Sequence, residues 1–418
     1  MIHYGDITKI NGHEIPLVDI ITGGSPCQDL SVAGKRKGLA GERSGLFMEQ
    51  IRIIKEMRDE SAEQLRVRGA NVDFRLIQPR YMVWENVPGA FSSNNGEDFR
   101  CVLEEVCRIA DKTANVPRPE KGWWSKSGCI MGTGWSVAWR LHDAQFWGVP
   151  QRRKRIALVA DFGGQSAPEI LFERESVSGN PEKGSDNGQE VAGSVRTSTD
   201  LSSYTLKIRG GVEVDSHGRK AGKGALIQTE LSATLGVSQD QILITNKCLN
   251  SVLQNPIYSI GHDIRSSKLT ADEKTDPLTA SDYKEPIKVT DSSVVRRLTP
   301  LECERLQGYP DHWTDIGEWT DSKGKKHKDA DSPRYKALGN SIALPFWEWM
   351  AGRMVKQLGT DKPTMASLFD GIGGFPLVYS RCGCKPVWAS EIEEFPIAVT
   401  KIRFPEGAED EKIQGICS

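Results

Sequence analysis

The sequence lacks long apolar runs and a strong excess of charge, and both absences exclude classes of protein. No stretch approaches the roughly 18 apolar residues that a membrane-spanning helix needs, and no basic segment followed by an apolar run opens the chain. We therefore expect a cytoplasmic protein without a membrane anchor. The net charge of only −2 neither demands nor excludes a polyanionic partner, so a nucleic-acid surface would need local clusters of lysine and arginine.

Metal-ligand spacing is missing as well. The nine cysteines are scattered, and their odd number in a chain of this length does not indicate a disulfide framework. Cys382 and Cys384 form a close pair without a second pair to complete a metal site, so we interpret them as structural. The seven histidines show no ligand spacing either. We expect no metal, and reduced thiols of which one can be chemically active.

Short apolar runs alternate with amphipathic stretches, which is typical of parallel strands joined by helices. Residues 17–22, 81–84 and 156–160 predict buried strands, and apolar residues at helical spacing predict helices around 47–57 and 99–110. The fold class that fits this pattern is α/β, with a Rossmann-like doubly wound sheet.

The composition changes in the middle of the chain, and 418 residues exceed the roughly 100 to 200 of a typical domain. Residues 174–200 are rich in Gly, Ser, Asn and Glu, as in a linker. Beyond them, segments such as 204–208 and 241–245 resemble short strands separated by glycine. We predict a main domain in two parts, 1–165 and 333–418, around a smaller, mostly β lobe at 166–332.

A glycine turn near the end of the chain has the pattern of a nucleotide site. A predicted strand at 364–368 runs into Phe369-Asp370-Gly371-Ile372-Gly373-Gly374, and a second predicted strand at 386–390 ends in Glu391. The separation of 20 residues between Gly371 and Glu391 matches the step to the acid that holds ribose hydroxyls in Rossmann units. Pro376 replaces the third glycine of the dinucleotide fingerprint, which weakens a pyrophosphate-binding interpretation. A tight strand-to-helix turn without a ligand remains the alternative.

Three polar groups follow or precede other predicted strands. Cys27 lies in the loop Gly23-Gly24-Ser25-Pro26-Cys27-Gln28 after the strand 17–22, where open α/β sheets bind ligands. Glu85 follows the strand 81–84, although such glutamates often only begin helices. Gln151-Arg152-Arg153-Lys154-Arg155 leads into the strand 156–160, and Arg153 and Arg155 share one face of an extended chain.

The blocks Pro-Cys-Gln, Glu-Asn-Val and Gln-x-Arg-x-Arg, in this order, resemble the catalytic motifs of the cytosine-5 DNA methyltransferase family. Two further blocks resemble family motifs, namely Arg296-Arg297-Leu298-Thr299-Pro300-Leu301-Glu302-Cys303-Glu304-Arg305-Leu306-Gln307-Gly308-Tyr309-Pro310 and Ala337-Leu338-Gly339-Asn340-Ser341. The resemblance covers about residues 4–160 and 296–404 and disappears between them.

The order of the blocks departs from the family pattern. The family usually begins with the glycine turn, whereas here the turn and Glu391 come last and the chain opens with Gly5-Asp6-Ile7. We interpret this as circular permutation, which is tolerated where termini lie close together on the surface. It predicts that the two ends of the chain are neighbours in an ordinary family fold.

The resemblance implies a mechanism and its residues. Cys27 would attack C6 of cytosine, Glu85 would hydrogen-bond or protonate N3, Arg155 would hold O2, and Arg153 would orient the loop and Glu85. The cofactor would be S-adenosyl-L-methionine. Ile392 stands where the family often has an aromatic residue against the adenine. The implied cofactor-binding residues are Phe369, Asp370, Gly371, Ile372, Gly373, Gly374, Glu391, Ile392, Asp6, Ile7, Pro26, Leu46 and Asn340.

The implied substrate is double-stranded DNA, from which the target nucleotide must be rotated to expose C6. The loop 31–43, with basic residues at 35–37, would close over the flipped base. Lobe 166–332 would read bases in the major groove. We expect a monomer from a prokaryotic or phage-encoded methylation or restriction-modification system.

Three other interpretations remain. A branch of the family methylates tRNA, although the long segment between 161 and 294 favours a DNA-recognition lobe. A catalytically silent DNA-binding relative is disfavoured by the intact Cys27, Glu85, Arg153 and Arg155. A Rossmann oxidoreductase would leave the Pro-Cys-Gln loop unexplained.

Overall fold

The structure is a computed structural model that describes residues 1–25, 45–69, 73–119, 122–172, 203–214, 220–229, 241–245 and 295–406. Pro26, Cys27 and the predicted lid at 31–43 lie outside the described residues. Within the described ranges, no helix is long and apolar enough to cross a membrane. The same ranges hold no group of three His, Cys, Asp or Glu side chains that could bind a metal ion.

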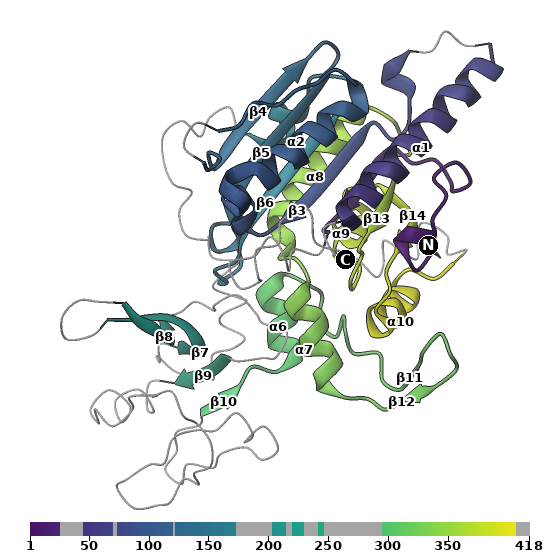
Figure 1. Cartoon of the computed structure of the whole chain (residues 1–418). Helices are drawn as coiled ribbons and strands as arrows, with labels where there is room; N and C mark the ends of the chain where they lie inside the picture. The colour runs from purple at the N-terminus through teal and green to yellow at the C-terminus, as the bar shows by residue number, and fades with distance from the viewer. Residues whose placement is uncertain are drawn as a thin grey trace, which may run out of the picture.

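The main domain is an α/β sandwich around an eight-stranded sheet (Figure 1). The strand order is β1-β14-β13-β2-β3-β6-β5-β4. These strands are β1 (Ile2–His3), β2 (Ile20–Gly23), β3 (Tyr81–Asn86), β4 (Ser127–Gly132), β5 (Trp135–Asp143), β6 (Lys154–Asp161), β13 (Thr364–Leu368) and β14 (Lys385–Ser390).

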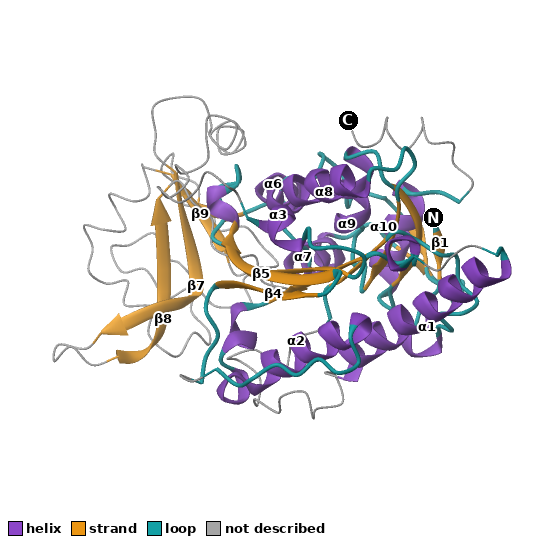
Figure 2. Ribbon diagram, turned by 90° about the horizontal axis from the view of Figure 1, so that it is seen from above, coloured by secondary structure: helices purple, strands orange, loops and turns teal. Residues whose placement is uncertain are grey.

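Helices cover both faces of this sheet. Figure 2 shows α1 (Gly45–Val67) and α2 (Glu97–Ala110) on one face, and α3 (Ala167–Leu171), α8 (Leu344–Leu358) and α9 (Gly374–Arg381) on the other. Each face has its own hydrophobic core. The other α-helices within the described ranges are α6 (Pro300–Gln307), α7 (Asp331–Asn340) and α10 (Glu394–Arg403). The predicted α/β fold with a Rossmann-like sheet is confirmed.

The strands of the sheet do not all run in the same direction. β1, β14, β13, β2 and β3 are parallel neighbours. In contrast, β6 runs antiparallel to β3, and β5 and β4 continue in antiparallel fashion. The sequence predicted 156–160 as a buried strand without giving its direction, because a buried apolar run does not determine whether a strand is parallel or antiparallel. The sheet is mixed.

The two ends of the described chain are neighbours, as the permuted motif order predicts. The amino group of Met1 donates to the carbonyl of Phe404 at 3.2 Å. The strand β1 pairs in parallel with β14, and the Tyr4 amide donates to the Ala389 carbonyl at 2.9 Å. The first residues thus extend the sheet beside the strand that ends before Glu391.

A second, antiparallel sheet has the order β10-β9-β7-β8, formed by β10 (Val295–Arg297), β9 (Gln241–Thr245), β7 (Ser203–Val214) and β8 (Lys220–Thr229). It lies in the predicted small lobe, and the limits of that lobe at 166 and 332 remain a prediction. Leu298, Leu306 and Trp313 are buried in the same core as α8 and α9. These three residues of the predicted lobe therefore pack against the main domain.

Local interactions fix both ends of α6, which follows Leu298 in the chain. Thr299 caps the helix by accepting from the Glu302 amide at 3.2 Å, and the Glu302 carboxylate accepts from the Thr299 amide at 2.8 Å. Such a capping box satisfies donors that would otherwise lack partners at a helix start. Gly308 ends the helix with φ of 80°, which glycine adopts readily. The next residue, Tyr309, is thereby directed into the main core.

Candidate active site

Glu85 and Arg155 form an ion pair at the carboxyl end of β3. Their side chains approach to 2.7 Å between Arg155 Nε and Glu85 Oε1, and each is 15% exposed. The pair exists because β6 is antiparallel to β3, so that the beginning of β6 lies beside the end of β3, with Glu85 opposite Ala157. Two predicted catalytic residues, 70 positions apart in the chain, are thus brought together.

The backbone that leads toward Cys27 begins beside this pair. A Cβ atom added to Gly24 would lie 3.0 Å from Oε2 of Glu85, so the glycine allows a close approach of the chain to the carboxylate. The Ser25 hydroxyl accepts from the Trp84 indole at 3.0 Å, which fixes the same segment. Cys27 and Pro26 follow directly and lie outside the described residues. The described segment therefore ends at Ser25, two residues before the predicted nucleophile.

Arg153 has a different environment from the one expected. It is buried whereas Arg155 is partly exposed, and Arg152 and Lys154 are exposed, which confirms the predicted alternation. The Arg153 guanidinium donates to the carbonyls of Gly339, at 3.2 Å, and Ser341. Arg155, rather than Arg153, pairs directly with Glu85, and the role of Arg153 in orienting the loop and Glu85 stays a prediction. The two arginines are two residues apart in an extended segment, which places their side chains at successive positions along the same face. Each side chain therefore contacts a different partner.

A series of contacts connects Arg153 to the glycine turn. The hydroxyls of Tyr309 and Ser341 are hydrogen-bonded, and Ser341 also accepts from Arg153 through its carbonyl. A Cβ at Gly374 would lie 2.5 Å from the Tyr309 hydroxyl. Tyr309 and Ser341 belong to motif blocks noted in the sequence but were not predicted as site residues. In the sequence, only their place in those motif blocks marked Tyr309 and Ser341 as of interest. Motif membership alone does not show that the two residues contact each other.

The glycine turn has the predicted relation to Glu391. The Gly371 amide donates to Glu391 Oε2 at 2.7 Å, and the amides of Ile392 and Glu393 donate to Oε1 at 2.8 and 2.9 Å. Gly371 has φ of 58°, and a Cβ there would meet no atom within 4 Å. The turn is therefore open at Gly371 and bounded by the acid. This confirms that the strand ends carrying the two motifs are adjacent.

Individual side chains of the turn face different ways. Ile372 is fully buried in the core, and its carbonyl accepts from the Trp313 indole at 2.8 Å. Phe369 is partly buried, whereas Ile392 is 68% exposed. The main chain at Gly371, rather than the Ile372 side chain, is thus available to a ligand. The exposed Ile392 leaves its predicted contact with adenine untested.

Asp370 is a buried acid, and no residue that the structure describes forms a hydrogen bond with either of its carboxyl oxygens. Burial raises its pKa to about 8, the Ser367 hydroxyl opposes this shift, and the charge of Glu391 adds to it. A buried carboxyl without a cation is more stable when protonated. Asp370 is therefore mainly neutral at pH 7, and its carboxyl faces the interior.

The remaining cofactor candidates come from three other elements. Ser390, directly before Glu391, donates to the Gly5 carbonyl at 2.6 Å and so places Asp6 and Ile7 near the acid. The partly exposed Asp6 accepts from the Thr8 amide at 3.0 Å, while Ile7 is buried. Leu46 packs at the start of α1, and Asn340 is exposed between the two residues that bind Arg153.

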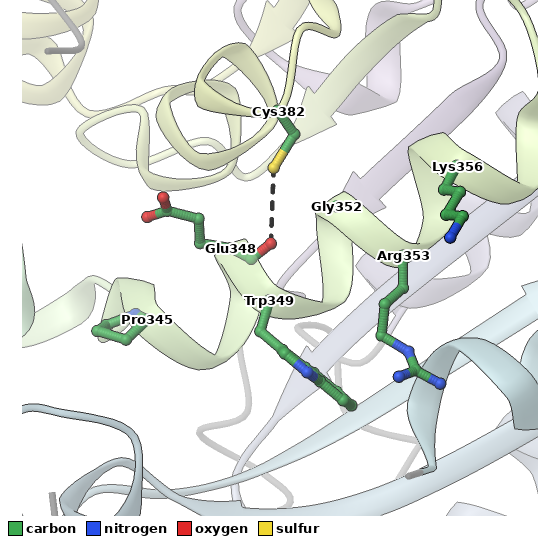
Figure 3. A pocket seen from close by; sticks show the side chains of 7 residues that line it. All are labelled: Pro345, Glu348, Trp349, Gly352, Arg353, Lys356 and Cys382. Atoms are coloured by element: carbon green, nitrogen blue, oxygen red, sulfur yellow. Dashed lines mark hydrogen bonds between the residues drawn. The ribbon is translucent and has the colours of Figure 1, made fainter. Parts of the chain in front are cut away.

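Cys382 lies in a separate hollow along α8 (Figure 3), lined by Pro345, Glu348, Trp349, Gly352, Arg353, Lys356 and Cys382. Its thiol donates to the Glu348 carbonyl at 3.6 Å. Burial raises the pKa of Cys382 to about 11, and burial also raises the pKa of Cys384, so both thiols are poor nucleophiles at neutral pH. None of the predicted site residues lines this hollow. The interpretation of both cysteines as structural agrees with this environment.

The family model for C-5 cytosine-specific DNA methylase matches residues 1–109 and 130–356. A relative named DNA N-6-adenine-methyltransferase, from Escherichia phage P1, is 29% identical over 86% of this chain and 56% of its own length. The type II methyltransferase M1.ScrFI of Lactococcus lactis is 25% identical over 86% of this chain and 68% of its own length. The chain thus spans little more than half of the phage P1 relative.

Among solved structures, the S. pombe Dnmt2 methyltransferase aligns with a TM-score of 0.39 and 14% identity, covering 85% of this chain and 84% of that one.

Proposed function

The chain belongs to the C-5 cytosine-specific DNA methylase family, and from this premise we infer that it is a DNA methyltransferase. We propose that it methylates C5 of a cytosine rotated out of duplex DNA, with S-adenosylmethionine as the donor. A single observation supports this choice most directly. The Glu85 and Arg155 side chains form a partly exposed pair beside Gly24, three residues before Cys27.

The pair fits one edge of a pyrimidine ring. N3 and O2 are adjacent acceptors on cytosine, so their protein partners must also be adjacent. Glu85 would hold or protonate N3 and Arg155 would bind O2, and their separation of 2.7 Å satisfies this requirement. The positive charge of the Arg155 guanidinium would stabilise negative charge that develops on the ring.

Cys27 would supply the nucleophile. Its thiolate would add to C6, and the electron pair of the C5–C6 double bond would shift through C4 to N3, which takes a proton from the protonated form of Glu85 while Arg155 binds O2. The product is an enamine whose C5 is nucleophilic. S-adenosylmethionine supplies an electrophilic methyl group when it is bound. Loss of the C5 proton and expulsion of Cys27 would then restore the aromatic ring as 5-methylcytosine.

The residues at the glycine turn fit an adenosine without phosphate. Glu391 accepts from backbone amides next to the open position at Gly371, where ribose hydroxyls would find an acceptor. Pro376 replaces the third glycine of the dinucleotide fingerprint, so the fingerprint for a pyrophosphate-containing ligand is incomplete, and S-adenosylmethionine contains no pyrophosphate. The complete proposed set is Phe369, Asp370, Gly371, Ile372, Gly373, Gly374, Glu391, Ile392, Asp6, Ile7, Pro26, Leu46 and Asn340, with Asp370 and Ile372 acting through their main chain.

The name of the phage P1 relative raises a second candidate, methylation of adenine N6. The matched region covers 56% of that relative, so its name alone does not assign a base to the shared part. The adenine amino group is itself the nucleophile and needs no thiol addition. The combination of Pro26-Cys27-Gln28 with Glu85 and Arg155 therefore favours cytosine.

The test is a nucleoside analysis after reaction with unmethylated duplex DNA and labelled S-adenosylmethionine. We expect label in 5-methylcytosine, and none in N6-methyladenine. Parallel reactions with tRNA test the substrate class. Label in adenine or only in tRNA would contradict the proposal, and a lack of transfer with intact cofactor binding would favour a silent DNA-binding relative.

A further inference from the structure

A small basic hairpin interrupts the chain between α6 and α7. It consists of β11 (Trp319–Thr320), β12 (Lys326–His327) and the turn 321–325 between them. Four lysines are exposed on it or directly after it, and within the described ranges none forms an ion pair with a carboxylate. They are Lys323, Lys325, Lys326 and Lys328. We call this set the hairpin lysines.

The acid inside the hairpin is used to hold its shape. Asp321 Oδ1 accepts from the amides of Lys323 and Lys325 at 3.0 and 2.9 Å. Its other oxygen pairs with the His327 ring at 2.9 Å. The His327 ring stacks on Trp319 with centroids 4.1 Å apart and planes at 11°. Asp321 therefore organises the turn.

The hairpin is also fixed to the main domain through α10 (Figure 1). The Ser322 amide donates to Glu394 at 2.8 Å, and its hydroxyl donates to the other oxygen of the same carboxylate. Trp319 packs edge-on against Phe395 at 5.6 Å. The nearby Glu393 is paired with Lys336 at 2.7 Å. The two acids closest to the hairpin on α10 thus have their own partners.

We propose that the hairpin lysines bind phosphates of the DNA backbone. Four ammonium groups within six residues are concentrated on a chain whose net charge is only −2. Lysine contacts phosphate as a flexible point charge, which suits backbone binding without sequence reading. The inference rests on DNA as the substrate, and it adds a contact surface separate from Glu85 and Arg155. S-adenosylmethionine carries no phosphate, so the cofactor is not the ligand.

The experiment compares two variants with the same change of charge. The first is Lys323→Gln/Lys325→Gln/Lys326→Gln/Lys328→Gln. The matched control is Lys112→Gln/Lys356→Gln/Lys362→Gln/Lys401→Gln, which removes four exposed lysines from separate elements. Binding of each full-length protein to a fluorescent duplex is measured by anisotropy from about 50 to 200 mM salt, the range over which phosphate contacts dominate the change in affinity.

Loss of each phosphate contact lowers the slope of log affinity against log salt by about 0.9. We expect the hairpin variant to lose about 1 to 3 in this slope and on the order of 10-fold or more in affinity, while S-adenosylmethionine binding stays unchanged. Equal slopes for the hairpin variant and the control would overturn the proposal. A weaker cofactor affinity in the hairpin variant would instead indicate a structural role for the hairpin. Failure of the wild-type protein to bind DNA at all would contradict the proposed function itself.

Discussion

The two halves of the candidate site are built in different ways. At the end of β3, charged side chains face each other, and the Glu85 carboxylate is bound by Arg155. At the glycine turn, main-chain amides bind Glu391, and the nearby Asp370 carboxyl is buried with no hydrogen bond to any residue in the described part of the chain. One half thus places charged side chains at the site, and the other is formed mainly by main-chain groups. Substitutions should therefore affect chemistry in the first half and binding or stability in the second.

The largest expected effect comes from Glu85→Gln. The amide keeps the size of the side chain but can neither pair with Arg155 as an anion nor protonate N3. We expect the rate of methyl transfer to fall by about 10²- to 10⁴-fold, the usual contribution of a general acid. Cofactor affinity should remain within a factor of two of wild type. Single-turnover kinetics measure the rate, and Glu63→Gln, on an exposed part of α1, is the control.

Arg153→Met tests whether the two halves are connected through hydrogen bonds of Arg153. Arg153 donates to the Gly339 and Ser341 carbonyls, and Ser341 is bonded to Tyr309 beside the glycine turn. Its removal leaves buried acceptors unsatisfied, and we expect a loss of about 2 to 4 kcal/mol in the free energy of unfolding. Urea denaturation measures this loss. The exposed neighbour provides the control as Arg152→Met, and equal stability of both variants would refute the connecting role.

Gly374→Ala tests the expectation that substitutions at the glycine turn affect cofactor binding and stability. The added methyl would lie 2.5 Å from the Tyr309 hydroxyl, so the turn or Tyr309 must shift. We expect a loss of about 1 to 3 kcal/mol in stability, as for other overpacked sites, and weaker S-adenosylmethionine binding. Calorimetric titration measures the affinity. Gly352→Ala, where the new atom would only touch Cys382 at 3.7 Å, should bind the cofactor like wild type.

The smallest expected effect concerns Asp370 and pH. Its pKa is raised to about 8 in the folded protein, so folding stability from the neutral acid is present at low pH and is lost as pH rises toward 8. Between pH 7 and 9 we expect wild type to lose about 1 kcal/mol relative to Asp370→Asn. Thermal unfolding across this range measures the difference. Parallel pH profiles for the two proteins would show that Asp370 does not carry the effect.

The sequence was sufficient for features that depend on local pattern. The strand 364–368 is found as predicted, and the spacing of 20 residues correctly placed Glu391 beside Gly371. The apolar run 156–160 predicted a buried strand, which β6 confirms. The permuted motif order also predicted that Met1 and the residues near Phe404 are neighbours, since the missing connection had to be short in space.

Features that depend on the direction of strands or on distant contacts could not be predicted. Apolar residues in β6 show that it is buried but not that it is antiparallel to β3, and this orientation brings Arg155 to Glu85. The division of roles between Arg153 and Arg155 follows from contacts with Gly339 and Ser341, nearly 190 residues away. The packing of Trp313 in the main core likewise has no local signal.

The central claim is that the thiol of Cys27 reaches C6 of a cytosine held by Glu85 and Arg155. Its most direct test is incubation with S-adenosylmethionine and a duplex containing 5-fluorocytosine at every candidate target, where fluorine prevents release of the protein. We predict a denaturation-resistant protein–DNA adduct whose linkage maps to Cys27 by mass spectrometry, and its absence in Cys27→Ser. An adduct that persists in Cys27→Ser would contradict the account, as would methylation of ordinary cytosine by that variant.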